Sequence, residues 1–140
     1  MNPEELRAFL ERCDPALVGV VGTLREDGAP HVVPVWYRWD GDAILIWTDD
    51  VRVWLQNLRR DPRIAFSVQE IQAPFAAVTM RGRATLTRGR DDELLTEIGH
   101  IIERYVPANE LGGFLKSWLV GPQIVVRIEP EVVRSWNAAI

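Results

Sequence analysis

Cysteine is almost absent from this sequence. Cys13 stands alone among 140 residues, so an internal disulfide and a zinc site built from several cysteines are both excluded. The two histidines, His31 and His100, fall on different expected elements, so a metal site built on them is not expected. A chain without disulfides is typical of a reducing compartment, and we expect a cytoplasmic protein.

Long apolar runs are missing as well. No stretch approaches the ~18 consecutive apolar residues that a membrane helix needs. The opening segment MNPEELRAFLERCD carries acidic residues and no apolar signal-peptide core, so we expect no membrane association. A net charge of -4 also argues against nucleic acid as a partner.

The sequence also lacks the familiar signatures of catalysis. GVVG at 19–22 has neither the third glycine nor the following helix of a dinucleotide-binding loop. There is no Walker lysine motif, no G-x-S-x-G and no H-E-x-x-H. Because nothing supplies an acid, a base and a nucleophile together, any reaction is expected to draw its reactivity from a cofactor.

What the chain does have is the composition of one globular domain over residues 1–140, with 47% hydrophobic residues. Helical spacing and capping signals predict helices over 2–12, 51–60, 91–106 and 109–119, the second of them capped by Asp49 or Asp50. Strand patterns fall at 16–24, 30–39, 43–48, 63–69, 76–87, 123–130 and 132–136. This order, with mostly hairpin connections, predicts an antiparallel barrel trimmed with helices rather than a parallel nucleotide-binding sheet.

Two residues interrupt the strand patterns. Pro34 lies in the middle of PHVVPVWYRW and brings no N–H to a sheet ladder. The stretch is therefore either an edge strand or a strand whose backbone faces a bound ligand, and the residues alone leave both open. Gly82, inside the strand pattern of 76–87, predicts a bulge or a close backbone approach.

Tryptophan is abundant for so short a chain. Most of these side chains are expected in the core or in a dimer interface, because large aromatics stabilise wherever apolar area is buried. Those near a pocket mouth can flank a flat heteroaromatic ring. The six are Trp36, Trp39, Trp47, Trp54, Trp118 and Trp136.

Four segments occur in order along the chain: VGTLREDGAPHVVPVWYRWDGD, ILIWTDD, NLRRDPRIAFSV and VTMRGRATL. Together they resemble the pyridoxamine 5'-phosphate oxidase-like split β-barrels, in particular the short flavin/deazaflavin oxidoreductase branch that uses F420. The resemblance covers about residues 5–87 and continues more loosely to VVRIEPEVVRSW. It implies a mainly β fold with flanking helices, a split β-barrel of the FMN-binding type, assembled as a homodimer.

The resemblance also implies a site, in a groove between two subunits and against the second strand. It places the cofactor ring along Val32, Val33, Pro34 and Val35, with Trp36 and Trp47 near it. It places the phosphate near Thr48, Arg52 and Asn57, with Arg81 or Arg83 adding charge-assisted contacts. Trp54 stands where the family commonly has a phosphate-binding lysine, and Asp49 and Asp50 would repel a phosphate at the start of the helix.

The leading functional expectation is an F420-dependent reductase that transfers a hydride from reduced deazaflavin to a small organic acceptor, with no catalytic side chain. An FMN-dependent oxidoreductase on the same barrel is the alternative. A third possibility, from another class, is a non-enzymatic protein that binds a flavin, a tetrapyrrole or another flat ligand.

Overall fold

The computed structural model describes residues 1–138. Seven strands and four helices follow one another within these residues. In chain order they are α1 (Pro3–Glu11), β1 (Gly19–Leu24), β2 (Pro30–Val35), β3 (Tyr37–Trp39), β4 (Ile44–Thr48), α2 (Val53–Arg60), β5 (Arg63–Gln69), β6 (Ala77–Gly89), α3 (Asp92–Ile102), α4 (Ala108–Trp118) and β7 (Gln123–Trp136).

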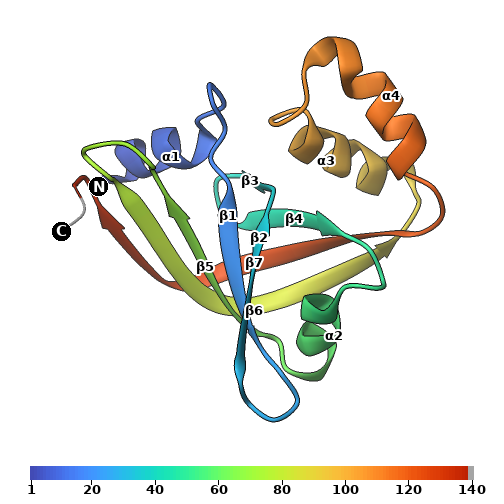
Figure 1. Ribbon diagram of the computed structural model, residues 1–140, viewed down its shortest axis with the longest axis horizontal. Helices are drawn as coiled ribbons and strands as arrows, with labels where there is room; N and C mark the ends of the chain where they lie inside the picture. Colours follow the sequence, from blue (N-terminus) through green and yellow to red (C-terminus); the bar gives the residue numbers. More distant parts are fainter. Residues whose placement is uncertain (139–140) are drawn as a thin grey trace.

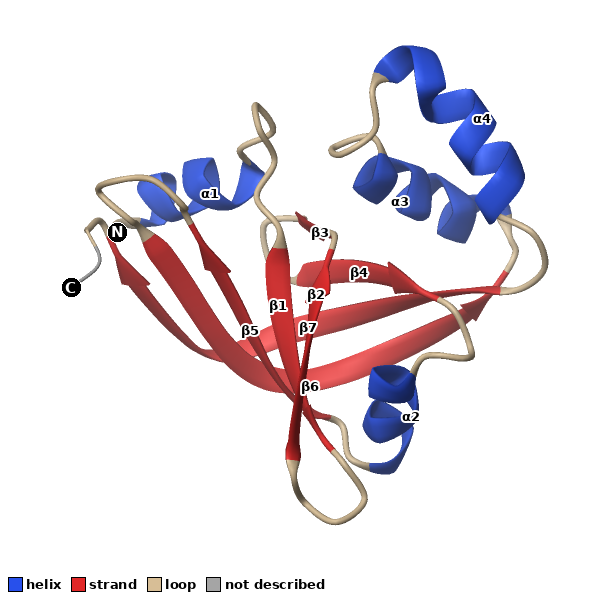
Figure 2. Ribbon diagram, in the orientation of Figure 1, coloured by secondary structure: helices blue, strands red, loops and turns tan. Residues whose placement is uncertain are grey.

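All seven strands belong to one antiparallel sheet with the order β2-β1-β5-β6-β7-β4-β3 (Figure 1). The sheet is strongly curved, and Figure 2 shows the helices arranged around its rim, with α3 and α4 beside β4 and α2 below it. The prediction of a mainly β fold with flanking helices is confirmed. The strands β2 and β3 form the two edges of the sheet within the described residues.

The expected strand over 30–39 is wrong in one respect, because it consists of two strands. Residues 30–35 pair with β1, whereas residues 37–39 pair with β4 at the other end of the sheet. Trp36 lies between them, where the chain leaves one edge and joins the other. The first four strands therefore form two separate hairpins, β1 with β2 and β3 with β4.

The two strands expected at 123–130 and 132–136 are a single strand, β7, that runs through a bulge. Gly82 pairs with Pro130 and Arg81 pairs with Val132, so Glu131 has no partner in the register. A Cβ atom on Gly82 would overlap the carbonyl oxygen of Glu129. The prediction of a bulge and a close backbone approach at Gly82 is confirmed.

The helix caps agree with the sequence at two helices and differ at a third. Asn2 and Glu5 form a reciprocal capping box on α1, and Asp91 caps α3. The N-cap of α2 is Arg52, not Asp49 or Asp50, and its side chain makes no capping bond. Asp49 accepts instead from the Val51 N–H, in the turn before the helix.

Two apolar clusters hold the fold together. The larger fills the concave side of the sheet, where the rings of Tyr37 and Phe66 meet edge to face with centroids 5.1 Å apart. The second lies under α3, where Ile98 and Ile101 pack against Leu45 of β4. Together the clusters fix the ends of β2, β4 and α2 relative to one another.

A half-buried arginine joins the N-terminal segment to the sheet. Arg104 donates to the carbonyl oxygens of Leu10 at 3.1 Å and Arg12 at 2.9 Å, and also to that of Tyr37. Its guanidinium lies 4.6 Å from the centroid of the Tyr37 ring, and the Tyr37 hydroxyl donates to Leu10 at 2.9 Å. Three segments distant in sequence therefore meet at one cation.

Within residues 1–138, no helix is both long enough and apolar enough to cross a membrane.

Candidate functional site

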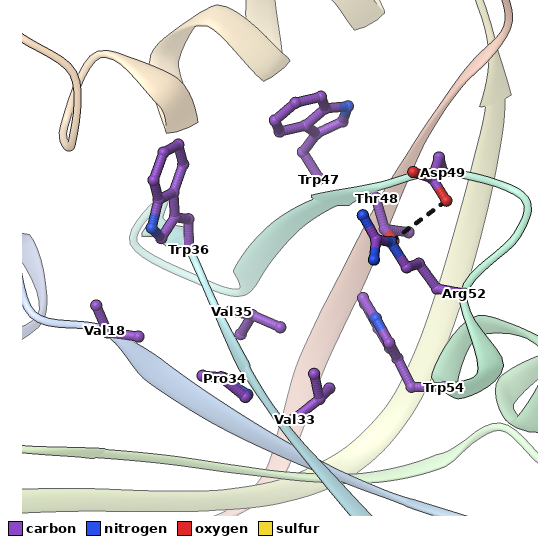
Figure 3. Close-up of a pocket in the computed structure, with 10 residues that line it drawn as sticks. All are labelled: Val18, Val33, Pro34, Val35, Trp36, Trp47, Thr48, Asp49, Arg52 and Trp54. Carbon is purple, nitrogen blue, oxygen red and sulfur yellow. Dashed lines mark ion pairs between the residues drawn. The ribbon is translucent and has the colours of Figure 1, made fainter. Parts of the chain in front are cut away.

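A cleft of about 390 Å³ opens between β2, the end of β4 and the start of α2 (Figure 3). Its lining is mostly apolar and aromatic, with polar groups gathered at one end. The lining residues are Val18, Val33, Pro34, Val35, Trp36, Trp47, Thr48, Asp49, Arg52 and Trp54.

One side of the cleft is the edge strand β2. Pro34 pairs in register with Val20 of β1 and borders the cleft on its other side. Pro30 and Pro34 are an even number of residues apart, so both ring nitrogens point to the same side of the strand, away from β1. The expectation of an edge strand is therefore confirmed for Pro34, and because Pro34 also lines a cleft, a ligand against this strand stays a prediction.

The indoles of Trp36 and Trp47 form the aromatic end of the cleft, and each is stacked on an aromatic ring that does not line the cleft. The Trp36 ring is stacked on Tyr105, with centroids 4.9 Å apart and planes inclined by 5°. Trp47 is stacked on Trp118 of α4 at 5.7 Å, and its Nε1 donates to Oε1 of Gln123 at 2.8 Å. Tyr105, Trp118 and Gln123 fix these two rings, and no local sequence pattern marks them for this role.

The opposite end of the cleft carries its charges. Nε of Arg52 lies 3.5 Å from the Asp49 carboxylate, and Figure 3 draws this ion pair across the upper side of the Trp54 indole. Both charged side chains are about half exposed or more, whereas Trp54 is buried. Among residues 1–138, Arg52 is the only basic side chain that lines the cleft.

The remaining cations around α2 are occupied elsewhere. Arg59 and Arg88 donate to Asp50 at 2.7 and 3.0 Å, and these bonds hold the pKa of Asp50 below its ordinary value. Arg60 donates to the carbonyl oxygen of Leu24 at 2.7 Å.

Four of the predicted site residues lie outside this cleft. Val32 is 69% exposed and does not line the cleft. Asn57 is buried, where its amide donates to Thr23 at 3.0 Å and its side-chain oxygen accepts from Arg60 at 3.1 Å. The other two line a second cleft of about 430 Å³ on the β5–β6–β7 face, together with Arg63 and Glu131. They are Arg81 and Arg83.

The cleft offers little acid–base chemistry. Its ionisable side chains are Asp49 and Arg52, which pair with each other. His31 contacts Arg25, and His100 contacts Glu103 on α3, so neither histidine of the chain lines the cleft. No group of three metal-ligating side chains occurs in the part of the chain that the structure describes. The arrangement can bind and orient a flat ligand, whose own chemistry would have to supply any reaction.

The family model described as pyridoxamine 5'-phosphate oxidase matches residues 3–137. The chain belongs to the pyridoxamine 5'-phosphate oxidase family. The resemblance drawn from the four sequence segments is therefore confirmed, although no curated protein matches the sequence.

Solved structures of this family place the chain among the split β-barrels. A conserved hypothetical protein from Mycobacterium tuberculosis is 27% identical, with a TM-score of 0.78 over 97% of this chain and 84% of that one. A protein described as an F420 reductase is 22% identical, with a TM-score of 0.67 over 91% of this chain and 94% of that one. The haem storage protein HutZ from Vibrio cholerae is 14% identical, with a TM-score of 0.73 over 99% of this chain and 96% of that one.

These likenesses confirm the split-barrel fold of the pyridoxamine 5'-phosphate oxidase family. They do not decide the ligand, because the fold carries both an F420 reductase and a haem storage protein. The choice between ligands rests on the residues of the cleft itself.

Proposed function

We propose that this protein is an F420-dependent oxidoreductase that holds the deazaflavin ring in the cleft between β2 and α2. The observation that carries the proposal is the composition of the cleft, which is apolar and aromatic along its length and has one balanced ion pair at its end. Sites for flat heteroaromatic cofactors have this character, with few polar groups that fix the orientation. The F420 reductase with the same fold supports the choice of cofactor.

The residues present fit such a ring. Val33, Pro34 and Val35 would lie along it, and Trp36 and Trp47 would limit it at the aromatic end. Thr48 and Arg52 would face the polar chain that leaves the ring. When bound and reduced, the deazaflavin supplies a hydride to a small electron-poor acceptor.

The chain's own contribution is binding, orientation and exclusion of water. The stacked pairs Trp36–Tyr105 and Trp47–Trp118 keep the aromatic end fixed, which reduces the entropy lost when a ligand is positioned. No side chain of the cleft is placed as a general acid or base, so the proton that completes the reduction of the acceptor would come from bulk water after the hydride transfer.

The charges of the cleft give the phosphate of FMN little to bind. A phosphate monoester carries a charge of about -1.5 to -2 at neutral pH and calls for more than one cation. The cleft provides Arg52, and Asp49 already balances its charge. The phosphodiester of F420 is a monoanion and makes a smaller demand. FMN remains the alternative cofactor.

A second candidate is a binding protein without turnover. The lack of acid–base groups in the cleft favours it as much as it favours cofactor-driven chemistry, and haem-binding proteins share the fold. Iron in haem needs an axial His, Cys, Met or Tyr, and none of these lines the cleft of the described chain. We therefore retain, as the second candidate, a protein that binds a flat ligand without iron.

We also propose that the protein is a homodimer, as members of the family are by resemblance. Several large apolar side chains lie exposed on the sheet, among them Val18, Val20, Val32 and Val133. A second copy that covers them would remove this area from water. Light scattering at micromolar concentration should give twice the chain mass of 15.9 kDa, and a monomer would reject the assembly.

Side-by-side titrations of the purified protein with F420 and FMN test the function. We expect quenching of F420 fluorescence, and oxidation of reduced F420 when an electron-poor alkene is added. A protein that binds FMN and ignores F420 would reject the cofactor. Tight binding of F420 with no change of its redox state in the presence of a panel of acceptors would favour the binding protein.

A further inference from the structure

The charged end of the cleft is electrically balanced, and this determines which part of a ligand it recognises. The guanidinium of Arg52 already has Asp49 as its partner, and Trp54 fills the neighbouring position with an indole. An incoming phosphate must compete with the Asp49 carboxylate for the one cation that the described residues of this chain place in the cleft. An exposed pair of this kind changes affinity by at most about fivefold.

No other cation near α2 can take over this role without loss. Arg59 and Arg88 share the Asp50 carboxylate, and Arg60 holds the carbonyl oxygen of Leu24. Asn57, the polar residue expected at the phosphate, is buried against Thr23. Each of these contacts would have to break before the side chain could reach a ligand in the cleft.

The three indoles that line the cleft are suited to contact with a ring. Trp54 is buried and fixed by the packing of α2, and Trp36 and Trp47 are each stacked on a second aromatic ring. Rings held in this way contribute apolar and stacking contacts without a loss of their own freedom. The binding energy is therefore concentrated on the flat part of a ligand.

We propose that the cleft recognises the tricyclic ring of its ligand and is nearly indifferent to the phosphate. This inference rests on the proposed function, and it names the ligand class more closely: flavins and deazaflavins with a bare ribityl chain bind about as well as their phosphate-bearing forms.

Four titrations followed by ligand fluorescence test the inference directly. The pairs are FMN with riboflavin, and F420 with the same deazaflavin ring on a bare ribityl chain. Within each pair that binds, we expect the two dissociation constants to agree within about fivefold. A phosphate-bearing form that binds more than about fivefold tighter would overturn the inference and leave the proposed function intact. If none of the four compounds binds, the proposed function itself fails.

Two variants test whether the Asp49 carboxylate and the Trp54 indole each weaken the binding of a phosphate. Asp49→Asn frees Arg52 at an exposed position and should raise the preference for FMN over riboflavin by at least about threefold. Trp54→Lys should raise it by at least about tenfold. Val53→Lys adds the same charge one residue earlier, at an exposed position that does not line the cleft, and should leave the preference unchanged.

The Asp49 variant keeps the test decisive if Trp54→Lys does not fold, because Asp49 is exposed and asparagine retains the oxygen that accepts from Val51. An Asp49→Asn protein with the preference of the unaltered chain would show that Asp49 does not neutralise Arg52, and it would overturn the inference.

Discussion

The Trp118 indole of α4 lies against the Trp47 indole of β4, with ring centroids 5.7 Å apart and planes inclined by 23°. Trp118 also lies 6.0 Å from Trp36 and 4.3 Å from Phe114. No residue of α4 is fully buried, and Trp118 joins the helix to the two indoles of the cleft while Leu111 and Leu115 pack against the cluster under α3. The same contacts form the rear of the candidate cleft.

Removing the Trp118 ring should weaken the packing of α4 against the rest of the protein. Each aromatic pair contributes about 0.5–1.5 kcal/mol beyond burial, so we expect Trp118→Ala to lower the free energy of unfolding by about 2 kcal/mol. The α4 amides should exchange faster with solvent, measured by hydrogen–deuterium exchange. Val120→Ala, at a 73% exposed position after the helix, is the control and should change stability by less than about 0.5 kcal/mol. Unaltered exchange in the Trp118 variant would contradict the attachment.

Substitutions of two glycines should change the free energy of unfolding in opposite directions, because Gly82 lies at the bulge and Gly112 has open space around it. Gly82→Ala places a methyl group into the Glu129 carbonyl oxygen and should lower the free energy of unfolding by about 2–3 kcal/mol. Gly112→Ala, inside α4 with open space around it, should raise that free energy by about 0.5–1 kcal/mol. Chemical denaturation of both variants measures the difference, and equal effects would show that the close approach at the bulge is not limiting.

Arg104 should be among the costly charged residues to remove. Arg104→Ala leaves three partly buried carbonyl oxygens without this donor, and we expect a loss of about 3 kcal/mol in denaturation experiments. Arg104→Lys should recover less than about half of that loss, because an ammonium group cannot reproduce the planar fork. Arg7→Ala, which removes an exposed pair with Glu11, should cost less than about 0.5 kcal/mol. A full rescue by lysine would show that the charge alone matters.

Stability should fall at strongly alkaline pH because of Tyr37. Burial raises the pKa of Tyr37 to about 12, whereas in the unfolded chain it is about 10. The unfolded state therefore loses its proton first, so the contribution is complete below about pH 10 and is lost as the pH rises to about 12. Burial raises the pKa of Tyr105, the only other tyrosine, in the same direction.

Denaturation between about pH 9 and 12 measures this loss, and Tyr37→Phe should flatten the pH dependence. Absorbance of the native protein provides a second measurement, since both tyrosines should ionise above the pH at which the unfolded chain does. Ionisation at the same pH in both states would contradict the burial of these hydroxyls.

Much of the fold could be predicted from local patterns. The cap at Asp91, the alternation of Ile64, Phe66 and Val68, and the bulge at Gly82 each depend on neighbours in the sequence or on backbone sterics. The break at Trp36 could not be predicted. It depends on the stack with Tyr105, a contact that no local pattern reveals.

The candidate site could likewise be predicted only in part. The structure brings the predicted residues of β2 and β4 together along one cleft, because strand order fixes them, and their contact with a cofactor stays a prediction. Asn57 looked like a polar ligand residue, yet the structure uses it to join α2 to Thr23, a partner on another element. The pairing of Asp49 with Arg52 was also hidden, since charges near a helix start have several possible partners until the loop is folded.

The two prolines of β2 have a further consequence for how the protein meets other chains. A free strand edge normally serves as a template on which a second polypeptide can extend the sheet, and Pro30 and Pro34 withhold two of the N–H groups that such growth requires. This edge therefore resists aggregation and swapped strands, while its side toward the cleft stays accessible to a small molecule.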